Sequence, residues 1–125
     1  MEGSPVSSFR QQMEDEAPKG FKLPPPARLR HYGLTAEQYR ELWGDGFCPI
    51  CLKPFGPGPR TACIDHDHRT WEVRGVLDTS CNYTLGYMHD NADWFQRAAN
   101  YLLHPPTELW TPRPRLEDAP PRQGD

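Results

Sequence analysis

Residues 61–82 read TACIDHDHRTWEVRGVLDTSCN, and this stretch decides the fold. Residues 61–65 have the apolar and β-branched composition of a strand, and the polar run at 66–70 indicates a turn. Residues 71–74 alternate like a return strand that Gly75 ends, and residues 79–89 are expected to form a helix. The stretch therefore predicts a strand, a turn, a strand and a helix in that order.

Two pairs of residues at the same spacing indicate a zinc site. Cys48-x-x-Cys51 places two thiols so that both can reach one tetrahedral ion, and Asp78-x-x-Cys81 repeats the spacing. Zinc prefers thiolates and also accepts the harder carboxylate oxygen. The sequence therefore predicts a structural zinc held by these four residues. Two alternatives stay open: Cys63 is the fourth ligand in place of Asp78, or the cysteines are simply buried apolar residues.

The segment Asp65-His66-Asp67-His68 carries groups suited to metal-assisted hydrolysis. A carboxylate oxygen can hold a hard cation, and a neutral imidazole can take a proton from water. Because neighbouring residues of a strand point to opposite faces, Asp65 and His66 serve one site only if the backbone bends between them. The alternative is a solvated polar turn between two strands.

Asn82 lies near the start of the helix expected at 79–89. If this helix packs across the hairpin, its first residues lie beside the carboxylate of Asp65. An amide oxygen and a carboxylate oxygen then form a two-point site of the kind that Mg²⁺ or Mn²⁺ favours when phosphate and water complete the shell. The alternative for Asn82 is a hydrogen bond at a helix terminus. Arg74, on the return strand, is either a salt-bridging residue or a phosphate contact.

Two further helices are expected beside this unit. Thr35 and Gln38 form a capping-box pattern before an apolar stripe, which predicts a helix at 36–43 that ends at Gly44. A second amphipathic helix is expected at about 92–103, with Asp90 or Asn91 as its cap.

Proline crowds the two ends of the 125-residue chain. Segments 1–30 and 104–125 are therefore predicted to be disordered arms, because they cannot bury enough apolar surface to offset chain entropy. The remaining 31–103 is small for a fold held by its core alone, so a metal staple is expected. The predicted fold class is α+β: a small zinc-stapled strand–strand–helix domain with flanking helices.

Composition narrows the location and the partners. The chain has no apolar run long enough for a membrane span and no secretory signal pattern at its start, so an intracellular protein with reduced thiols is expected. Its formal net charge of −3 argues mildly against nucleic-acid binding. Local basic patches remain available at Arg28 with Arg30 and at Arg113 with Arg115, unless these arginines only solubilise the termini.

Taken in order, these segments resemble the phage recombination endonuclease VII family, which belongs to the HNH, or His-Me finger, nucleases with a ββα-metal fold. The resemblance covers about residues 31–103, and the ordered combination is specific although no single segment is. It rests on residues 32–35 (YGLT), the Cys48-x-x-Cys51 pair, and residues 65–68 (DHDH), 73–77 (VRGVL) and 81–86 (CNYTLG).

The resemblance implies a role for each site residue. Asp65 and Asn82 hold the catalytic Mg²⁺ or Mn²⁺, and His66 is the general base that activates water. His68 assists by orienting a group or by contacting the scissile phosphate. The structural zinc is bound by Cys48, Cys51 and Cys81.

The function implied is a divalent-metal-dependent DNA endonuclease that hydrolyses phosphodiester bonds. The best-known family member resolves branched DNA such as four-way (Holliday) junctions as a homodimer, and many relatives nick DNA less selectively. The expected partner is DNA, duplex or branched, and the expected location is the cytoplasm of the bacterial host in which the phage protein is made.

Two departures from the family pattern bear on these expectations. The family usually has cysteine at the position of Asp78, which affects zinc affinity, and the chain lacks a long folded region after 103, where the prototype builds its dimer and its grip on the junction. One alternative is a non-catalytic zinc-binding module that docks DNA or a protein. Another is a nicking or packaging-associated phage nuclease.

Overall fold

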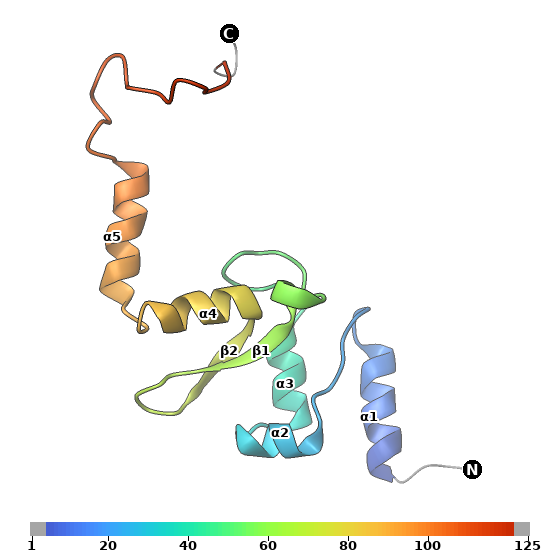
Figure 1. Cartoon of the computed structure of the whole chain (residues 1–125). Coiled ribbons are helices and arrows are strands. Elements are labelled where there is room, and N and C mark those ends of the chain that lie inside the picture. The colour runs from blue at the N-terminus through green and yellow to red at the C-terminus, as the bar shows by residue number, and fades with distance from the viewer. Residues whose placement is uncertain (1–4, 122–125) are drawn as a thin grey trace. The chain divides into compact units, whose positions relative to one another are not determined.

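The computed structural model describes residues 5–121 of the chain, which divide into two compact units with their boundary in the sequence between Asp90 and Asn91. Helices and a two-stranded antiparallel sheet make up the described part, so the predicted α+β class is confirmed (Figure 1). None of the described helices is long and apolar enough to cross a membrane. The elements of the first unit are α1 (Pro5–Glu16), α2 (Pro26–His31), α3 (Ala36–Trp43), the 3₁₀ turn η1 (Gly58–Arg60), β1 (Ala62–His66), β2 (Val73–Asp78) and α4 (Thr79–Tyr87), and the second unit contains α5 (Ala92–Leu103).

The strand–turn–strand–helix order predicted from residues 61–82 is present as β1, β2 and α4, and α4 contacts both strands. The prediction that Gly75 ends the return strand is wrong, because β2 continues through Gly75 to Asp78. Gly75 lies opposite Asp65 in the ladder, and the next residues, Val76 and Leu77, are buried. Their burial holds the strand together across a residue that has no side chain to pack.

The hairpin is irregular between Asp65 and His66. Asp65 pairs with Gly75, whereas His66 pairs with Val73, so Arg74 is an extra residue on β2. A bulge of this kind raises the local twist and re-aims side chains, and bulges are common beside active sites. The structure thus has an irregularity at the step from Asp65 to His66, and the extra residue that makes it lies on the opposite strand.

The core of the first unit joins the hairpin to α3 and to the segment before α2. Ile64 and Val76 contribute from the two strands, and Tyr39 and Trp43 contribute from α3. The ring of Phe21 packs edge-on against Trp43 with the ring centroids 5.2 Å apart. This core holds one side of the hairpin fixed by burial of large aromatic and branched side chains.

The structure differs from the disordered arm expected at 1–30. Phe21, Leu23 and Leu29 are buried in the core. The guanidinium of Arg10 on α1 donates hydrogen bonds to the carbonyls of Leu23 and Pro24, at 3.3 and 2.6 Å. The prolines interrupt the helices of this segment, but the apolar residues between the prolines still pack on α3. Residues 1–4 and 122–125 lie outside the described part of the chain, and the disorder predicted for 104–125 stays a prediction.

The capping box predicted at the start of α3 is confirmed. The Thr35 hydroxyl accepts a hydrogen bond from the Gln38 backbone at 3.0 Å, and the Gln38 side chain accepts one from the Thr35 backbone at 2.9 Å. The helix ends at Gly44, which has a φ of +61°. Both ends of α3 are thus fixed by local sequence, and Tyr39 and Trp43 face the core as a result.

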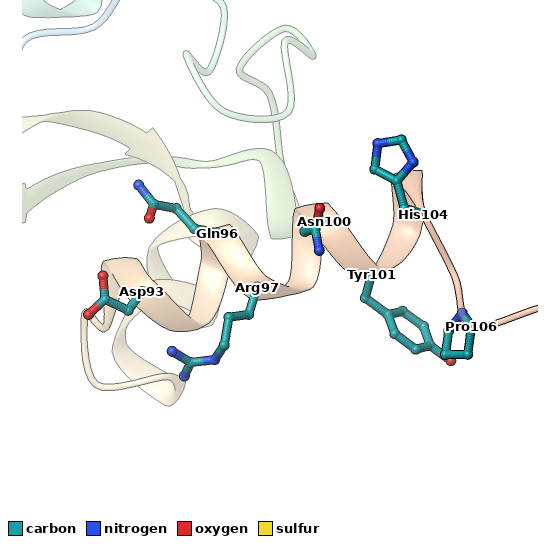
Figure 2. A pocket seen from close by; sticks show the side chains of 7 residues that line it. All are labelled: Asp93, Gln96, Arg97, Asn100, Tyr101, His104 and Pro106. Carbon is teal, nitrogen blue, oxygen red and sulfur yellow. The ribbon is translucent and has the colours of Figure 1, made fainter. Parts of the chain in front are cut away.

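The second unit is built on α5, whose bounds agree with the expected 92–103. The side chain of Asn91 accepts a hydrogen bond from the Trp94 backbone at 3.0 Å and caps the helix. A shallow cavity of about 610 Å³ lies along this helix (Figure 2). None of the site residues predicted from the sequence lines this cavity, because all of them lie in the first unit.

Candidate metal and catalytic sites

The four residues predicted to bind zinc come together in the structure. One ligand atom from each of Cys48, Cys51, Asp78 and Cys81 lies within 4.8 Å of all the others. A tetrahedral zinc with zinc–sulfur distances of about 2.3 Å has its ligand atoms about 3.8 Å apart. The cluster therefore fits a structural metal such as zinc in both size and donor chemistry.

A tight turn presents the first two thiols of this cluster. The backbone of Cys48 donates a hydrogen bond to the carbonyl of Lys53 at 2.9 Å, and the backbone of Leu52 donates to the carbonyl of Cys48 at 2.9 Å. Leu52 has a φ of +66°, which side chains rarely adopt. The turn reverses the chain directly after Cys51, so that both thiols of the pair face the same point.

Asp78 uses its two carboxylate oxygens for different purposes. Oδ1 accepts a hydrogen bond from the Cys81 backbone at 2.8 Å and so caps α4. Oδ2 accepts one from the Cys51 thiol at 2.9 Å and faces the cluster. Cys63 lies elsewhere, with its sulfur 3.1 Å from the Thr79 hydroxyl. The geometry therefore answers the question left open by the sequence: Asp78, and not Cys63, belongs to the cluster.

The cluster perturbs the acidity of its own members. Burial, followed by the hydrogen bond with Asp78, raises the pKa of the Cys81 thiol to about 12. The hydrogen bond with Asp78 raises the pKa of the Cys51 thiol, and the same bond lowers the pKa of the Asp78 carboxyl. These shifts favour the protonated form of Cys51 and Cys81, whereas backbone hydrogen bonds outweigh burial and lower the pKa of the Cys48 thiol. A bound zinc would displace the thiol protons.

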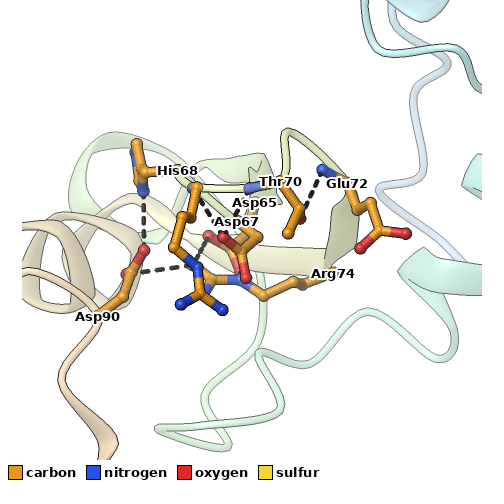
Figure 3. A network of polar contacts seen from close by, with 8 residues as sticks. Asp65, Asp67, His68, Thr70, Glu72, Arg74 and Asp90 are labelled. Carbon is orange, nitrogen blue, oxygen red and sulfur yellow. Dashed lines mark hydrogen bonds and ion pairs between the residues drawn. The ribbon is translucent and has the colours of Figure 1, made fainter.

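A second group of polar side chains lies at the end of the hairpin (Figure 3). The Arg74 guanidinium donates to both oxygens of Asp65, at 2.8 and 2.9 Å, and to Asp90 at 3.2 Å. The other oxygen of Asp90 lies 2.9 Å from Nδ1 of His68. We call this set of Asp65, Arg74, Asp90 and His68 the hairpin network. It connects the predicted cation ligand to one of the predicted catalytic histidines.

Asp90 is the member of the hairpin network that sequence reasoning missed. The sequence pattern indicates only a helix cap at Asp90, whereas this residue lies in the turn after α4 with a φ of +55° and turns its carboxylate toward the hairpin. The hydrogen bond from His68, together with the bond from Arg74, lowers the pKa of Asp90. Its position depends on the path of the chain after α4, and the sequence gives no signal for that path.

His66 sits among aromatic rings at the end of β1. Its ring centroid lies 4.6 Å from that of His68, 6.0 Å from that of Tyr32 and 5.8 Å from that of Trp71. The Trp71 ring is nearly parallel to the imidazole, at 13°. The structure thus brings His66 beside the hairpin network. His68 links the two, because it belongs to the network and its ring lies next to that of His66.

Asn82 lies in the first turns of α4 and lines a cavity of about 690 Å³ in the first unit. Lys22 and Arg28 line the same cavity, which gives it two positive side chains. No hydrogen bond joins Asn82 to Asp65 in this structure, although both residues are described. Asn82 therefore lines a mainly apolar cavity that carries two positive side chains, while Asp65 is held by Arg74.

The donor set at Asp65 suits a hard cation. Asp65 is only 4% exposed, and its buried charge is balanced by the Arg74 guanidinium. A carboxylate and the amide of Asn82 offer the oxygen ligands that Mg²⁺ and Mn²⁺ accept. The donor chemistry of the two residues thus suits such an ion, but in this structure the Arg74 guanidinium holds both oxygens of Asp65.

Comparison with known proteins supports the sequence resemblance. Residues 27–104 match the family model described as recombination endonuclease VII. The Gene 59 protein of Mycobacterium phage L5 is 44% identical over 81 residues, which cover 62% of this chain and 49% of that protein. The Gene 59 protein of Mycobacterium phage D29 is also 44% identical over 81 residues, covering 62% of this chain and 48% of that protein. The chain therefore spans about half the length of these relatives. No solved structure matches it.

Proposed function

The chain belongs to the recombination endonuclease VII family, and on that premise we propose that it is a divalent-metal-dependent DNA endonuclease of the HNH, or His-Me finger, type. The proposal rests on the position of His66. Its ring lies beside that of His68, and the hairpin network joins His68 to the buried carboxylate of Asp65. Two imidazoles, a carboxylate and an arginine lie together at one irregular end of a hairpin.

His66 is the proposed general base. It lies at the last position of β1, and its ring is partly exposed, so a water molecule can reach it. An imidazole near neutral pH can take a proton from water that attacks phosphorus. His68, held by Asp90, is fixed beside it and either orients the attacking group or contacts the phosphate.

Asp65 and Asn82 are the proposed ligands of Mg²⁺ or Mn²⁺. Such an ion, when bound, neutralises charge on the phosphate and stabilises the leaving oxygen. Arg74 would have to leave Asp65 for the ion to bind there, and it would then be free to donate two parallel hydrogen bonds to a phosphate, a geometry that guanidinium groups favour. Arg74 would thus serve as a salt-bridging residue without the cation and as a phosphate contact with it.

The zinc cluster has a structural role in this proposal. Cys48 and Cys51 come from the turn after α3, while Asp78 and Cys81 come from the end of β2 and the start of α4. A zinc held by these residues would fix the first turn of α4, and this turn carries Asn82. Structural zinc sites can supply folding energy outright in small domains.

DNA is the proposed substrate, in branched or duplex form. The net charge of −3 is compatible with this because Lys22 and Arg28 gather at the cavity that Asn82 lines. Action as a homodimer, nicking of one strand, and a location in the cytoplasm of a bacterial host remain part of the proposal. Rates on a four-way junction and on a plain duplex distinguish a resolvase from a general nickase, since a resolvase must prefer the junction by more than a few-fold.

The test is cleavage of supercoiled plasmid by zinc-loaded protein with Mg²⁺ or Mn²⁺. The wild type is expected to nick the plasmid, and H66A is expected to lose about 10²–10⁴-fold in rate, which is the usual cost of losing a general base. H104A removes an exposed histidine of the second unit and serves as the matched control. Equal rates for H66A and the wild type would refute the assignment of His66.

A second candidate is a non-catalytic zinc-binding module that docks DNA or a protein. It is favoured by one observation, that Arg74 already holds both oxygens of Asp65. This candidate predicts bound zinc and no metal-dependent cleavage of plasmid, junction or duplex by folded wild-type protein.

A further inference from the structure

Trp71 stands out in the turn of the hairpin. It is 77% exposed, which is unusual for an indole, and its backbone has a φ of +68°. A bulky residue in this left-handed region is strained, and such strain persists only where the surrounding structure imposes it. Neither the zinc cluster nor the hairpin network uses this side chain.

The turn holds Trp71 in this conformation by several hydrogen bonds. Its backbone donates to the carbonyl of Asp67 at 2.7 Å, and the backbone of Asp67 donates to the carbonyl of Glu72 at 2.8 Å. The carboxylate of Asp67 also accepts bonds from the backbones of Arg69 and Thr70, at 2.7 and 3.1 Å (Figure 3). The indole is therefore presented by a rigid turn and not by a loose loop.

This turn presents the indole parallel to the imidazole of His66, at 13° and with the centroids 5.8 Å apart. Resting on the proposed function, we propose that Trp71 is a substrate-contact residue that stacks on an unpaired nucleobase next to the phosphodiester that His66 acts on. The indole provides a flat surface beside the proposed base, and most of that surface is open to a planar partner.

The surroundings favour a nucleobase over an apolar partner. His68 and Arg69 are exposed a few residues before Trp71 in the same polar turn, so the indole does not belong to an apolar run of the chain. Aromatic side chains that bind single-stranded nucleic acid combine in this way with positive groups that follow the backbone. A base inside an intact duplex is already stacked, so the contact selects DNA that contains unpaired bases.

The experiment compares two DNA probes that differ in one feature. Zinc-loaded protein without added Mg²⁺ or Mn²⁺ is titrated with a labelled duplex that carries an unpaired bulge and with the same duplex fully paired. W71A is expected to weaken binding to the bulged probe by about 5- to 150-fold, the range for loss of one base–aromatic stack. Binding to the paired probe is expected to change less than about twofold, because no stack is lost.

Three variants separate stacking from folding. W71F keeps an aromatic ring and is expected to retain most of the preference for the bulge. W71G is expected to lose the preference but to melt at or above the wild-type temperature, because glycine adopts a positive φ without strain. W110A removes an exposed indole of the second unit and is expected to leave both affinities unchanged.

The outcomes distinguish this inference from the proposed nuclease. If W71A binds the bulged and paired probes as the wild type does, or weakens both equally, the inference is overturned even where the wild type cuts plasmid. If the wild type cuts no DNA and W71A still loses the bulge preference, the stacking role stands and the nuclease proposal fails.

Discussion

The guanidinium of Arg74 donates hydrogen bonds to both carboxylate oxygens of Asp65, at 2.8 and 2.9 Å. The two residues are not opposite each other in the ladder, because Arg74 is the extra residue of the bulge. The Asp65 carboxyl raises the pKa of Arg74, as expected for a guanidinium paired with a buried anion. Arg74 therefore occupies the position where a cation that uses Asp65 must bind.

R74A is expected to lower stability in the absence of divalent ions by about 1–3 kcal/mol, because it leaves a buried carboxylate without its partner. Added Mn²⁺ should then raise the melting temperature of R74A more than that of the wild type, since the ion no longer competes with a guanidinium. Thermal melts over a Mn²⁺ titration measure this, with R69A as a control that removes an exposed arginine from the same hairpin. Identical Mn²⁺ shifts in R74A and the wild type would contradict the competition.

D78N separates the two roles of Asp78. Asparagine keeps a side-chain oxygen that can cap α4 but loses the negative ligand that faces the cluster. Zinc affinity, measured by competition with a chromophoric chelator, is expected to fall by about tenfold or more. C63S is expected to keep wild-type affinity because Cys63 contacts Thr79 instead. The reverse result, with C63S losing zinc and D78N keeping it, would make Cys63 the ligand.

Removal of zinc is expected to unfold the first unit. Zinc binding contributes about 10–16 kcal/mol in small zinc-finger peptides, which matches or exceeds the whole stability of a small domain. Circular dichroism should show loss of the cooperative thermal transition after chelation and its return when excess zinc is added. A chelated protein, verified as zinc-free, that keeps its transition would mean that the core is sufficient by itself.

Zinc affinity is expected to increase with pH. The pKa of Cys81 is raised to about 12 by burial and by Asp78, so the metal-free thiol keeps its proton at neutral pH. Zinc must displace that proton, and a rise in pH lowers the cost of doing so. Calorimetry in two buffers with different ionisation enthalpies should report protons released on binding. A pH-independent affinity between about pH 6 and 8, where thiols remain largely protonated, would contradict this.

Local signals predicted much of the fold. The capping box at Thr35 and the cap at Asn91 determine where two helices begin, and each lies within a few residues of the pattern that reveals it. The burial of Phe21 was not predicted, because it depends on Trp43, which lies far away in the sequence. Because Phe21 and Leu23 lie beside a run of prolines, their apolar alternation does not predict a buried segment.

The candidate site was predictable to a similar degree. The shared spacing of the Cys48–Cys51 pair and the Asp78–Cys81 pair is sufficient to predict the cluster, because two residues between ligands limit the distance between those ligands. The contribution of Asp90 and the backbone strain at Trp71 depend on how a helix ends and how a turn closes. Those features depend on tertiary contacts, so no local residue pattern predicts them.

The bulge means that deletion and substitution at one position have different consequences. R74A keeps the number of residues in the hairpin and removes only a charge. Deletion of Arg74 instead removes the extra residue, so that Val73 and Gly75 become neighbours opposite His66 and Asp65 in a regular ladder. The added twist that a bulge gives to a hairpin is then lost beside Asp65. A natural variant with one residue fewer between His66 and Gly75 therefore presents Asp65 and His66 on a less twisted hairpin, even where every remaining side chain is the same.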